Sequence, residues 1–375
     1  MYKTLTIVSD TAICYKNGTY YGFNAVVNEI KSFENLFDKI IWIGYNYPER
    51  HSDKTLIEIE SKNVEVVLLK KLGGKSIFAL IAILLNYPLI FFKILKYIRE
   101  ADVVHTRAPS HPAFIATVIS FFWKNKIWWH KFAGSWNAET LPFFYKFQRN
   151  LLVRAKHSKV TINGFWDNQP KHCLSFENPC LTTDNIIRGK EIIQFKKFDG
   201  RFTLCFIGRL DESKGVDVIL ASLKQIDLDK IEKIHFIGNS NSTKRSFFEK
   251  EALFLNDKAI FHGFLGKDKV HQILSESHFL LLPSKSEGFP KVIAEAACYG
   301  TIPIVSTVGS IPHYITDSNG FLWDKEVAIS FEEILMSAFE EKVNFLENKS
   351  RNLSILAEKF TFTNYLTKLK SDILL

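Results

Sequence analysis

Two cations in the second half of the chain stand where a parallel sheet would bind an anion. Arg209 and Lys214 follow an apolar run at residues 202–208, and Gly215 precedes a helix expected at residues 216–223. Ligands of doubly wound parallel sheets bind beyond the carboxyl ends of the strands. Two cations beside a helix N-terminus suit a diphosphate. Two solvated cations on an ordinary loop are the alternative interpretation.

Two glutamates follow the next strong strand pattern, at residues 279–282. Glu287 lies in the loop after that strand, and Glu295 lies inside a helix expected at residues 292–299. Gly288 permits a close approach of the backbone to a ligand. Carboxylates in nucleotide sites accept hydrogen bonds from sugar hydroxyls. The alternative is that both glutamates only stabilise the start of the helix.

Three blocks in this region resemble the retaining glycosyltransferases of the GT-B fold, specifically glycosyltransferase family 4. The blocks are Gly208-Arg209-Leu210 with Lys214-Gly215, then Ser284 with Glu287-Gly288-Phe289-Pro290 and Glu295-Ala296, then residues 300–305 with Gly309. Residues 237–238, 261–264 and 319–322 also resemble family positions. The similarity covers most of the C-terminal half. The N-terminal half matches only in its strand–helix rhythm, an early glycine-containing loop and Asn178-Pro179.

The resemblance implies a role for each matched residue in binding a nucleotide-sugar. Arg209 and Lys214 are expected to hold the donor diphosphate and neutralise the leaving group, which is the electrostatic centre of such catalysis. Glu295 is expected to bind the ribose and Glu287 the hydroxyls of the transferred sugar. The remaining donor-pocket positions, which contribute mainly backbone, are Gly208, Gly263, Gly288, Phe289 and Pro290.

Neither a metal nor a separate cofactor is expected, because two cations can stabilise the departing diphosphate. The D-x-D sequence Asp227-Leu228-Asp229 precedes an expected strand instead of following one, so we interpret it as a solvated loop. The histidines show no metal-ligand spacing.

A histidine that precedes a glycine in the N-terminal domain often contacts the donor sugar in this family. If Gly134 is that glycine, Ala133 occupies the histidine position. His130 and Lys131 lie close by, but adjacent residues of a strand point to opposite faces. Each of these two residues is therefore a separate candidate for contact with the donor.

The acceptor side is expected in the first half of the chain. Arg107 follows a strand expected at residues 103–105 and suits an acceptor phosphate, although it could be an ordinary loop arginine. Gly22 lies in a loop expected at residues 18–22, where it would allow close approach of the acceptor.

The excess of positive charge is confined to the first half of the chain. The 375 residues carry a net charge of +8, and residues 1–180 hold 23 lysines and arginines against 14 aspartates and glutamates. Residues 181–375 hold 25 against 26. This asymmetry favours an anionic partner, either nucleic acid or a membrane surface, over a merely basic solvated surface. No recognised nucleic-acid motif is present, whereas many aromatic residues accompany the cations, as at interfacial membrane surfaces or in aromatic cores.

Residues 77–98 form the most apolar stretch. Asn86, Pro88 and Lys93 interrupt it, and Lys93, Lys96 and Arg99 fall on one side near its end. A helix that crosses a bilayer needs about 20 apolar residues. We expect a helix that is buried or lies in a membrane interface, in preference to one that spans the membrane.

The elements that position these residues alternate between strand and helix almost throughout. This rhythm predicts an α/β protein with two consecutive, doubly wound parallel-sheet domains. The resemblance implies that they are the two Rossmann-like domains of the GT-B fold, which face a central cleft. We expect an acceptor-binding domain at residues 1–180, a polar linker at 181–200 and a nucleotide-sugar domain at 201–355. The resemblance also implies that residues 356–375 form a helix that packs back on the first domain. Ordinary globular composition excludes a disordered or fibrous chain.

Five scattered cysteines without C-x-x-C spacing fit a reducing compartment, and the N-terminus resembles a first strand instead of a signal peptide. The resemblance, together with the charge and aromatic content of the first half, implies a metal-independent, retaining glycosyltransferase at the inner face of the cytoplasmic membrane. Its expected partners are a UDP- or GDP-sugar, a lipid-linked saccharide acceptor of lipopolysaccharide or capsule type and an anionic membrane surface, but no nucleic acid. The alternatives are a non-catalytic module that binds a nucleotide-sugar or a membrane, a sugar-nucleotide epimerase and an inverting transferase.

Overall fold

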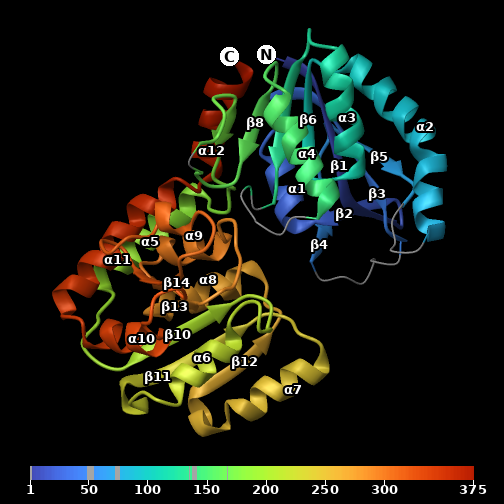
Figure 1. Ribbon diagram of the computed structural model, residues 1–375. Coiled ribbons are helices and arrows are strands. Elements are labelled where there is room, and N and C mark those ends of the chain that lie inside the picture. Colours follow the sequence, from blue (N-terminus) through green and yellow to red (C-terminus); the bar gives the residue numbers. More distant parts are fainter. Residues whose placement is uncertain (1, 49–54, 72–76, 135, 137–141, 167) are drawn as a thin grey trace. The chain divides into compact units, whose positions relative to one another are not determined.

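The computed structural model describes residues 2–48, 55–71, 77–134, 136, 142–166 and 168–375, with the backbone alone at residues 77–84. Contacts divide the chain into two compact units (Figure 1). The first unit comprises residues 1–176 and 366–375, and the second comprises residues 177–365. Each unit is an α/β domain built on its own sheet.

The sheet of the first unit has nine strands within the described residues, and most of them are parallel. The parallel strands follow the order β5-β3-β1-β6-β7-β8-β9, so the chain starts in the middle and builds outward in both directions. The antiparallel strands β2 and β4 extend one end of β1. The strands are β1 (Tyr2–Lys16), β2 (Thr19–Phe23), β3 (Phe37–Asn46), β4 (Leu56–Glu58), β5 (Val64–Leu69), β6 (Val103–Ala108), β7 (Ile127–Phe132), β8 (Lys159–Ile162) and β9 (Cys173–Ser175).

Gly22 lies in strand β2 and not in the expected loop. The chain turns at Asn17 and Gly18, which both have positive φ, as a tight hairpin between right-twisted strands requires. A Cβ atom at Gly22 would lie 3.0 Å from the Trp42 ring and from a methyl group of Val27. The missing side chain at Gly22 therefore makes room for the protein's own core, and its place in a strand corrects the expected loop. The acceptor contact of Gly22 stays a prediction.

Helix α2 covers one face of the first sheet with only one of its own sides. Ile90, Ile94 and Ile98 are spaced four residues apart and belong to a buried apolar cluster that also holds residues of strands β1, β3 and β5 and helix α3. Among the described residues, no helix combines the length and the unbroken apolar character needed to cross a bilayer. The helices of this unit are α1 (Asn24–Lys31), α2 (Ile77–Glu100), α3 (His111–Phe122) and α4 (Phe143–Arg154).

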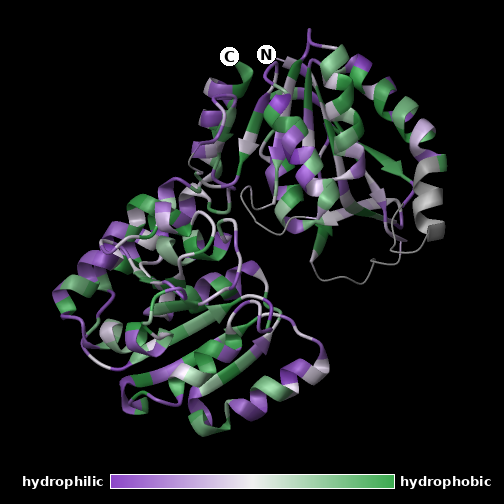
Figure 2. Cartoon of the chain, in the orientation of Figure 1, coloured by the Kyte–Doolittle hydropathy of each residue, from purple (hydrophilic) through white to green (hydrophobic). Residues whose placement is uncertain are grey.

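The sheet of the second unit has six parallel strands in the order β12-β11-β10-β13-β14-β15. The central strands are covered by helices on both faces, and Figure 2 draws them largely in the colour of apolar residues. The strands are β10 (Phe202–Ile207), β11 (Ile231–Ile237), β12 (Ala259–Gly263), β13 (Phe279–Leu282), β14 (Ile302–Ser306) and β15 (Phe321–Trp323). The helices are α5 (Thr183–Phe195), α6 (Val216–Leu223), α7 (Ser242–Glu251), α8 (Lys267–Glu276), α9 (Lys291–Cys298), α10 (Phe331–Glu340), α11 (Val343–Glu358) and α12 (Phe362–Leu369).

The expected polar linker at residues 181–200 is wrong, because most of it is helix α5 of the second unit. Thr182 and Asn185 form a reciprocal capping box at the start of this helix. Ile186 and Ile193 are buried, and the helix packs against α9 and α11.

The end of the chain belongs to both units. The boundary between them falls inside α12, so residues 366–375 group with the first unit and residues 356–365 with the second. Within the first unit, the hydroxyl group of Tyr2 donates a hydrogen bond to the carbonyl of Leu374. Lys368 Nζ donates a hydrogen bond to the carbonyl of Ser175 at 2.8 Å.

Replacing Gly189 with alanine should destabilise the second unit by about 1–3 kcal/mol. A Cβ atom there would lie 1.9 Å from the carbonyl oxygen of Cys298, so α5 would have to move away from α9. Denaturant unfolding measures the loss. Gly200→Ala is the matched control, because its Cβ would meet nothing within 4 Å. Equal stability of the two variants would contradict the close packing of α5 on α9.

Candidate functional site: the carboxyl edge of the second sheet

The order of the second sheet reverses between β10 and β13, which are neighbours although two strands separate them along the chain. At such a reversal the loops beyond the carboxyl ends of the strands diverge and leave room for a ligand. The two loops here span residues 208–215 after β10 and residues 283–290 after β13. They are the two segments that contain the predicted residues Arg209, Lys214 and Glu287.

The backbones of these loops lie in close contact. Gly215 has a φ of +79°, and a Cβ atom there would lie 2.3 Å from the carbonyl oxygen of Pro283. The amide of Lys285 donates to the carbonyl of Ser213 at 2.9 Å. Gly215 therefore combines a left-handed conformation with a close approach, both of which exclude a side chain.

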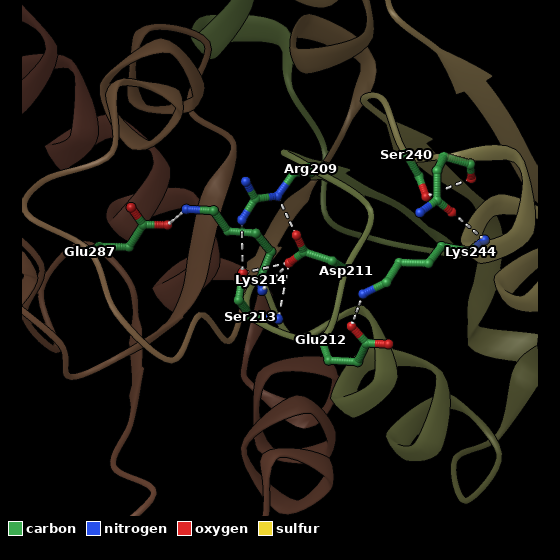
Figure 3. A network of polar contacts seen from close by, with 9 residues as sticks. Arg209, Asp211, Glu212, Ser213, Lys214, Ser240, Lys244 and Glu287 are labelled. Carbon is green, nitrogen blue, oxygen red and sulfur yellow. Dashed lines mark hydrogen bonds and ion pairs between the residues drawn. The ribbon is translucent and has the colours of Figure 1, made fainter. Parts of the chain in front are cut away.

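Lys214 and Glu287 join the two loops directly. Lys214 Nζ pairs with Glu287 Oε1, and the two side chains are 25% and 12% exposed (Figure 3). Arg209 pairs through Nε with Asp211, and its Nη2 donates to Ser213 Oγ at 3.3 Å. The Arg209 side chain is 67% exposed, so its guanidinium stays accessible to an anion. The structure thus brings Arg209, Lys214 and Glu287 together.

Asp211 shapes the loop that carries both cations, and no role was predicted for it from the sequence. Its Oδ1 accepts hydrogen bonds from the backbone amides of Ser213 at 3.0 Å and Lys214 at 3.1 Å. Burial opposes ionisation of this carboxyl, but the Ser213 and Arg209 hydrogen bonds outweigh it and hold its pKa below the ordinary value. An aspartate three residues before Lys214, in a turn, is the local pattern that could have revealed it.

A second ion pair ties the same loop to the neighbouring helix α7. Lys244, in the first turn of α7, pairs with Glu212 (Figure 3). Both side chains are more than 40% exposed, and this pair lies apart from Lys214 and Glu287 in the figure. Lys244 is therefore a natural control for the role of Lys214.

The other glycines of the predicted pocket line the same edge. The Gly208 amide donates to the Ile237 carbonyl, and the Gly238 amide donates to the Gly263 carbonyl, both at 2.9 Å. A Cβ atom at Gly238 would lie 1.7 Å from the carbonyl oxygen of Gly208. The ends of strands β10, β11 and β12 are thus held together through backbone contacts.

In the loop after β13, the backbone is available to a ligand, but the aromatic side chain of Phe289 is not. Phe289 is buried and its ring stacks on Phe360 at 4.7 Å between centroids, so the side chain belongs to the core. Pro290 precedes the first residue of α9 and has no amide hydrogen to donate. The carbonyl of Gly288 accepts hydrogen bonds from Ser310, through its amide at 2.9 Å and its hydroxyl at 3.0 Å. Ser284 Oγ, deep in the same loop, is buried without a hydrogen-bond partner among the described residues.

Glu295 lies further along α9, where the charges that act on it come from Lys267 and Lys291. Burial raises the pKa of its carboxyl, and the two lysines oppose that shift. The structure thus separates the two glutamates by role: Glu287 pairs with Lys214, while Glu295 is a half-buried acid whose ionised form costs stability.

Glu295→Gln should unfold at a higher temperature than the wild type near pH 8. An acid whose pKa is raised in the folded state gives its full stability below the unfolded pKa and loses it as pH rises through the folded pKa. The glutamine variant avoids this loss, so the difference in melting temperature should shrink as the pH falls toward 4.5. Thermal unfolding at several pH values measures it. The exposed Glu191→Gln is the control, and an equal shift in both variants would contradict the account.

A separate charged cluster lies at the carboxyl edge of the first sheet. Arg107 lies near the C-terminal end of β6, and Lys131 lies near the C-terminal end of β7. Both pair with Oε1 of Glu29, Arg107 through Nη1 at 2.8 Å and Lys131 through Nζ at 2.7 Å. Their side chains are 12% and 5% exposed, and that of Glu29 is 3% exposed. The sequence did not identify Glu29, although a carboxylate among the buried valines of α1 is an unusual position.

His130 is part of the core of the first unit. Its Nδ1 lies 2.8 Å from Thr106 Oγ1, and burial lowers its pKa to about 3. Its Nε2 is buried without a hydrogen-bond partner among the described residues. A ligand would reach this ring only if the side chains that cover it moved. The burial of His130 therefore argues against the predicted contact with a donor.

Among the described residues, no group of three His, Cys, Asp or Glu side chains could hold a metal ion. Asp227 instead caps the short 3₁₀ turn Leu228–Lys230, accepting from the amide of Asp229 at 2.9 Å.

Comparison with known proteins finds a sequence match over the part of the chain that carries this site. Residues 188–359 match the family described as Glycosyl transferases group 1. A protein encoded in the cps region of Klebsiella pneumoniae is 31% identical over 138 residues, which are 36% of this chain and 37% of that protein. A glycosyltransferase of Methanocaldococcus jannaschii is 26% identical over 287 residues, which are 72% and 73% of the two chains. For several of the curated relatives the match spans well under half of their length.

Solved structures match the whole fold at low sequence identity. A glycosyltransferase from Rickettsia africae covers 100% of this chain and 98% of its own, with a TM-score of 0.67 and 16% identity. Anabaena HepE in complex with UDP-glucose covers 99% and 98%, with a TM-score of 0.66 and 14% identity. The lipopolysaccharide outer core galactosyltransferase WaaB covers 99% of both chains, with a TM-score of 0.65 and 14% identity. The chain therefore has the GT-B fold, and residues 188–359 of its second unit match the glycosyl transferases group 1 family.

Proposed function

We propose that this protein is a retaining glycosyltransferase that moves a sugar from a nucleotide diphosphate donor to a lipid-linked or growing cell-surface polysaccharide. The observation that carries this proposal is the Lys214–Glu287 pair, which lies at the reversal of the second sheet beside the exposed guanidinium of Arg209. A cation already held by a carboxylate is positioned before the donor arrives.

The chemistry follows from the charge that develops as the glycosidic bond to the diphosphate breaks. Arg209 and Lys214 bind the diphosphate and neutralise the charge of the leaving group, without a metal ion. Glu287 fixes Lys214 and accepts hydrogen bonds from hydroxyls of the transferred sugar. Glu295 binds the ribose of the nucleotide, and the backbones at Gly208, Gly263 and Gly288 line the pocket. Retention follows if the acceptor attacks the face that the diphosphate leaves.

The donor and acceptor are proposed from charge and from the relatives. Anabaena HepE binds UDP and UDP-glucose in its crystal structures, which supports a UDP-sugar, with a GDP-sugar as the other candidate. The cps-region protein and WaaB support an acceptor of capsule or lipopolysaccharide type. The excess positive charge of residues 1–180 suits a lipid diphosphate at the inner face of the cytoplasmic membrane.

The test is a transfer assay with UDP- and GDP-sugars and lipid-linked saccharides extracted from bacterial membranes. We expect a longer saccharide whose new bond keeps the anomeric configuration of the donor, as read by NMR. An inverted bond would contradict the retaining mechanism. Conversion of the free nucleotide-sugar to an isomer would indicate an epimerase, and binding without any conversion would indicate a non-catalytic module.

A further inference from the structure

We propose that the outward side of helix α2 is the surface with which this protein lies on a bilayer of anionic phospholipid. The proposal deepens the proposed function, since a lipid-linked acceptor is presented at such a surface. Its own evidence, however, is independent of the donor site. It rests on the exposed apolar and cationic side chains of one helix in the first unit.

The described part of α2 exposes three large apolar side chains along one line. Leu85, Leu89 and Phe92 are 72%, 69% and 67% exposed. The spacing of four and then three residues places them on one side of the helix. The opposite side is the one that buries Ile90, Ile94 and Ile98 against the sheet. The helix is therefore apolar on two sides, of which the core covers only one.

Cations continue the same exposed side toward the C-terminus of α2. Lys93, Lys96 and Arg99 are exposed, and Glu100 is the acidic residue beside them. Lys93 Nζ donates to the carbonyl of Leu68 at 2.8 Å, and Lys96 Nζ lies 5.2 Å from the centre of the Tyr97 ring. Both ammonium groups thus stay at the surface while their stems follow the protein. An apolar stretch followed by cations on one side is typical of helices that lie in a membrane interface.

This order of side chains favours a lipid surface over a second copy of the chain. Two copies of α2 packed parallel would place the cations of one helix against those of the other. Packed antiparallel, they would bury the cations of each helix against the apolar stretch of its partner. Either arrangement opposes burial of charge. An anionic bilayer instead offers headgroups to the cations and an acyl boundary to the leucines and Phe92.

Flotation of the full chain with vesicles tests the proposal. The wild type should float with vesicles that mix phosphatidylcholine and phosphatidylglycerol, and less with phosphatidylcholine alone. Added salt should weaken the binding because it screens the cations. The combined Leu85→Ser, Leu89→Ser and Phe92→Ser variant should bind more than tenfold more weakly. Lys93→Glu with Lys96→Glu should lose the preference for anionic vesicles.

The matched control removes three apolar side chains from the second unit that are also more than half exposed. Ile187, Phe195 and Leu253 are 56%, 80% and 70% exposed, and their combined change to serine should leave flotation unchanged. Circular dichroism verifies that each variant is folded. Equal loss in the control, or unchanged flotation of the α2 variants, would overturn the proposal. So would a wild-type dimer in light scattering that the α2 triple variant dissociates.

A second readout separates this proposal from the proposed function. The α2 variants should bind nucleotide-sugar in solution as tightly as the wild type, because every changed residue belongs to the first unit. Loss of flotation with intact nucleotide binding supports the surface. If the wild type floats but binds no nucleotide-sugar, the membrane-binding proposal is supported and the proposed function is contradicted. Failure of the wild type to float would overturn the surface alone.

Discussion

Lys214→Ala should lower the rate of sugar transfer by about 10²–10³-fold, the usual cost of removing one group that stabilises the developing charge. Lys214 is the cation that Glu287 holds at the reversal of the second sheet. Its removal takes away a charge that neutralises the leaving diphosphate, and it leaves Glu287 as an unpaired anion facing that diphosphate. Steady-state kinetics of transfer measure the loss, which should fall mainly in kcat.

Lys244→Ala is the matched control for this prediction. Lys244 also pairs with a glutamate of the loop after β10, but its partner is Glu212 and both side chains are more than 40% exposed. Surface pairs of this kind contribute little, so stability and rate should stay close to those of the wild type. Equal rate losses at Lys214 and Lys244 would show that general positive charge, and not the Lys214 position, supports the reaction.

Glu29→Ala should destabilise the first unit by about 3–5 kcal/mol, because it leaves two buried cations without their shared carboxylate. Arg107 and Lys131 both pair with Glu29, and all three side chains are at most 12% exposed. Denaturant unfolding of the whole chain measures the loss. Glu58→Ala, at an exposed position of β4, is the control and should change stability little.

Removing one of the stranded cations provides a further check on this cluster. Glu29→Ala combined with Lys131→Met should recover part of the lost stability, since only Arg107 then lacks its partner. Residues in one ion-pair network are expected to be non-additive in this way. Additive losses in the double variant, or equal losses at Glu29 and Glu58, would contradict the electrostatic coupling of the cluster.

The strand–helix rhythm was predictable wherever an apolar run ended at a glycine or a proline. Helix α6 and strand β13 have the bounds expected from the sequence. Helix α5 was missed because it buries only three residues, Ile186, Gly189 and Ile193, and the glycine reads as a helix breaker. The packing role of Gly189 follows only from the structure, in which the carbonyl oxygen of Cys298 lies directly against it.

The candidate site was predictable to the extent that strand order determines it. Lys214 and Glu287 are 73 residues apart, yet each follows a strand beside the reversal of the sheet, so topology brings them together. The cluster in the first unit was not predictable, because Glu29 is 78 residues from Arg107 and 102 from Lys131 and stands on a helix. The burial of His130 was not predictable from its neighbours Trp129 and Lys131, because an apolar and a charged residue flank it. This burial argues against the donor contact, which stays a prediction.

The central claim is that the loops after β10 and β13 bind a nucleotide diphosphate sugar. Isothermal titration calorimetry with UDP, GDP and their sugars tests it most directly, on the wild type and on Arg209→Ala, Lys214→Ala and Lys244→Ala. We predict that the wild type binds one nucleotide class. The affinity for that class should be at least tenfold lower in Arg209→Ala and Lys214→Ala, and unchanged in Lys244→Ala. Binding that is absent for every nucleotide, or unchanged at both Arg209 and Lys214, would contradict the account.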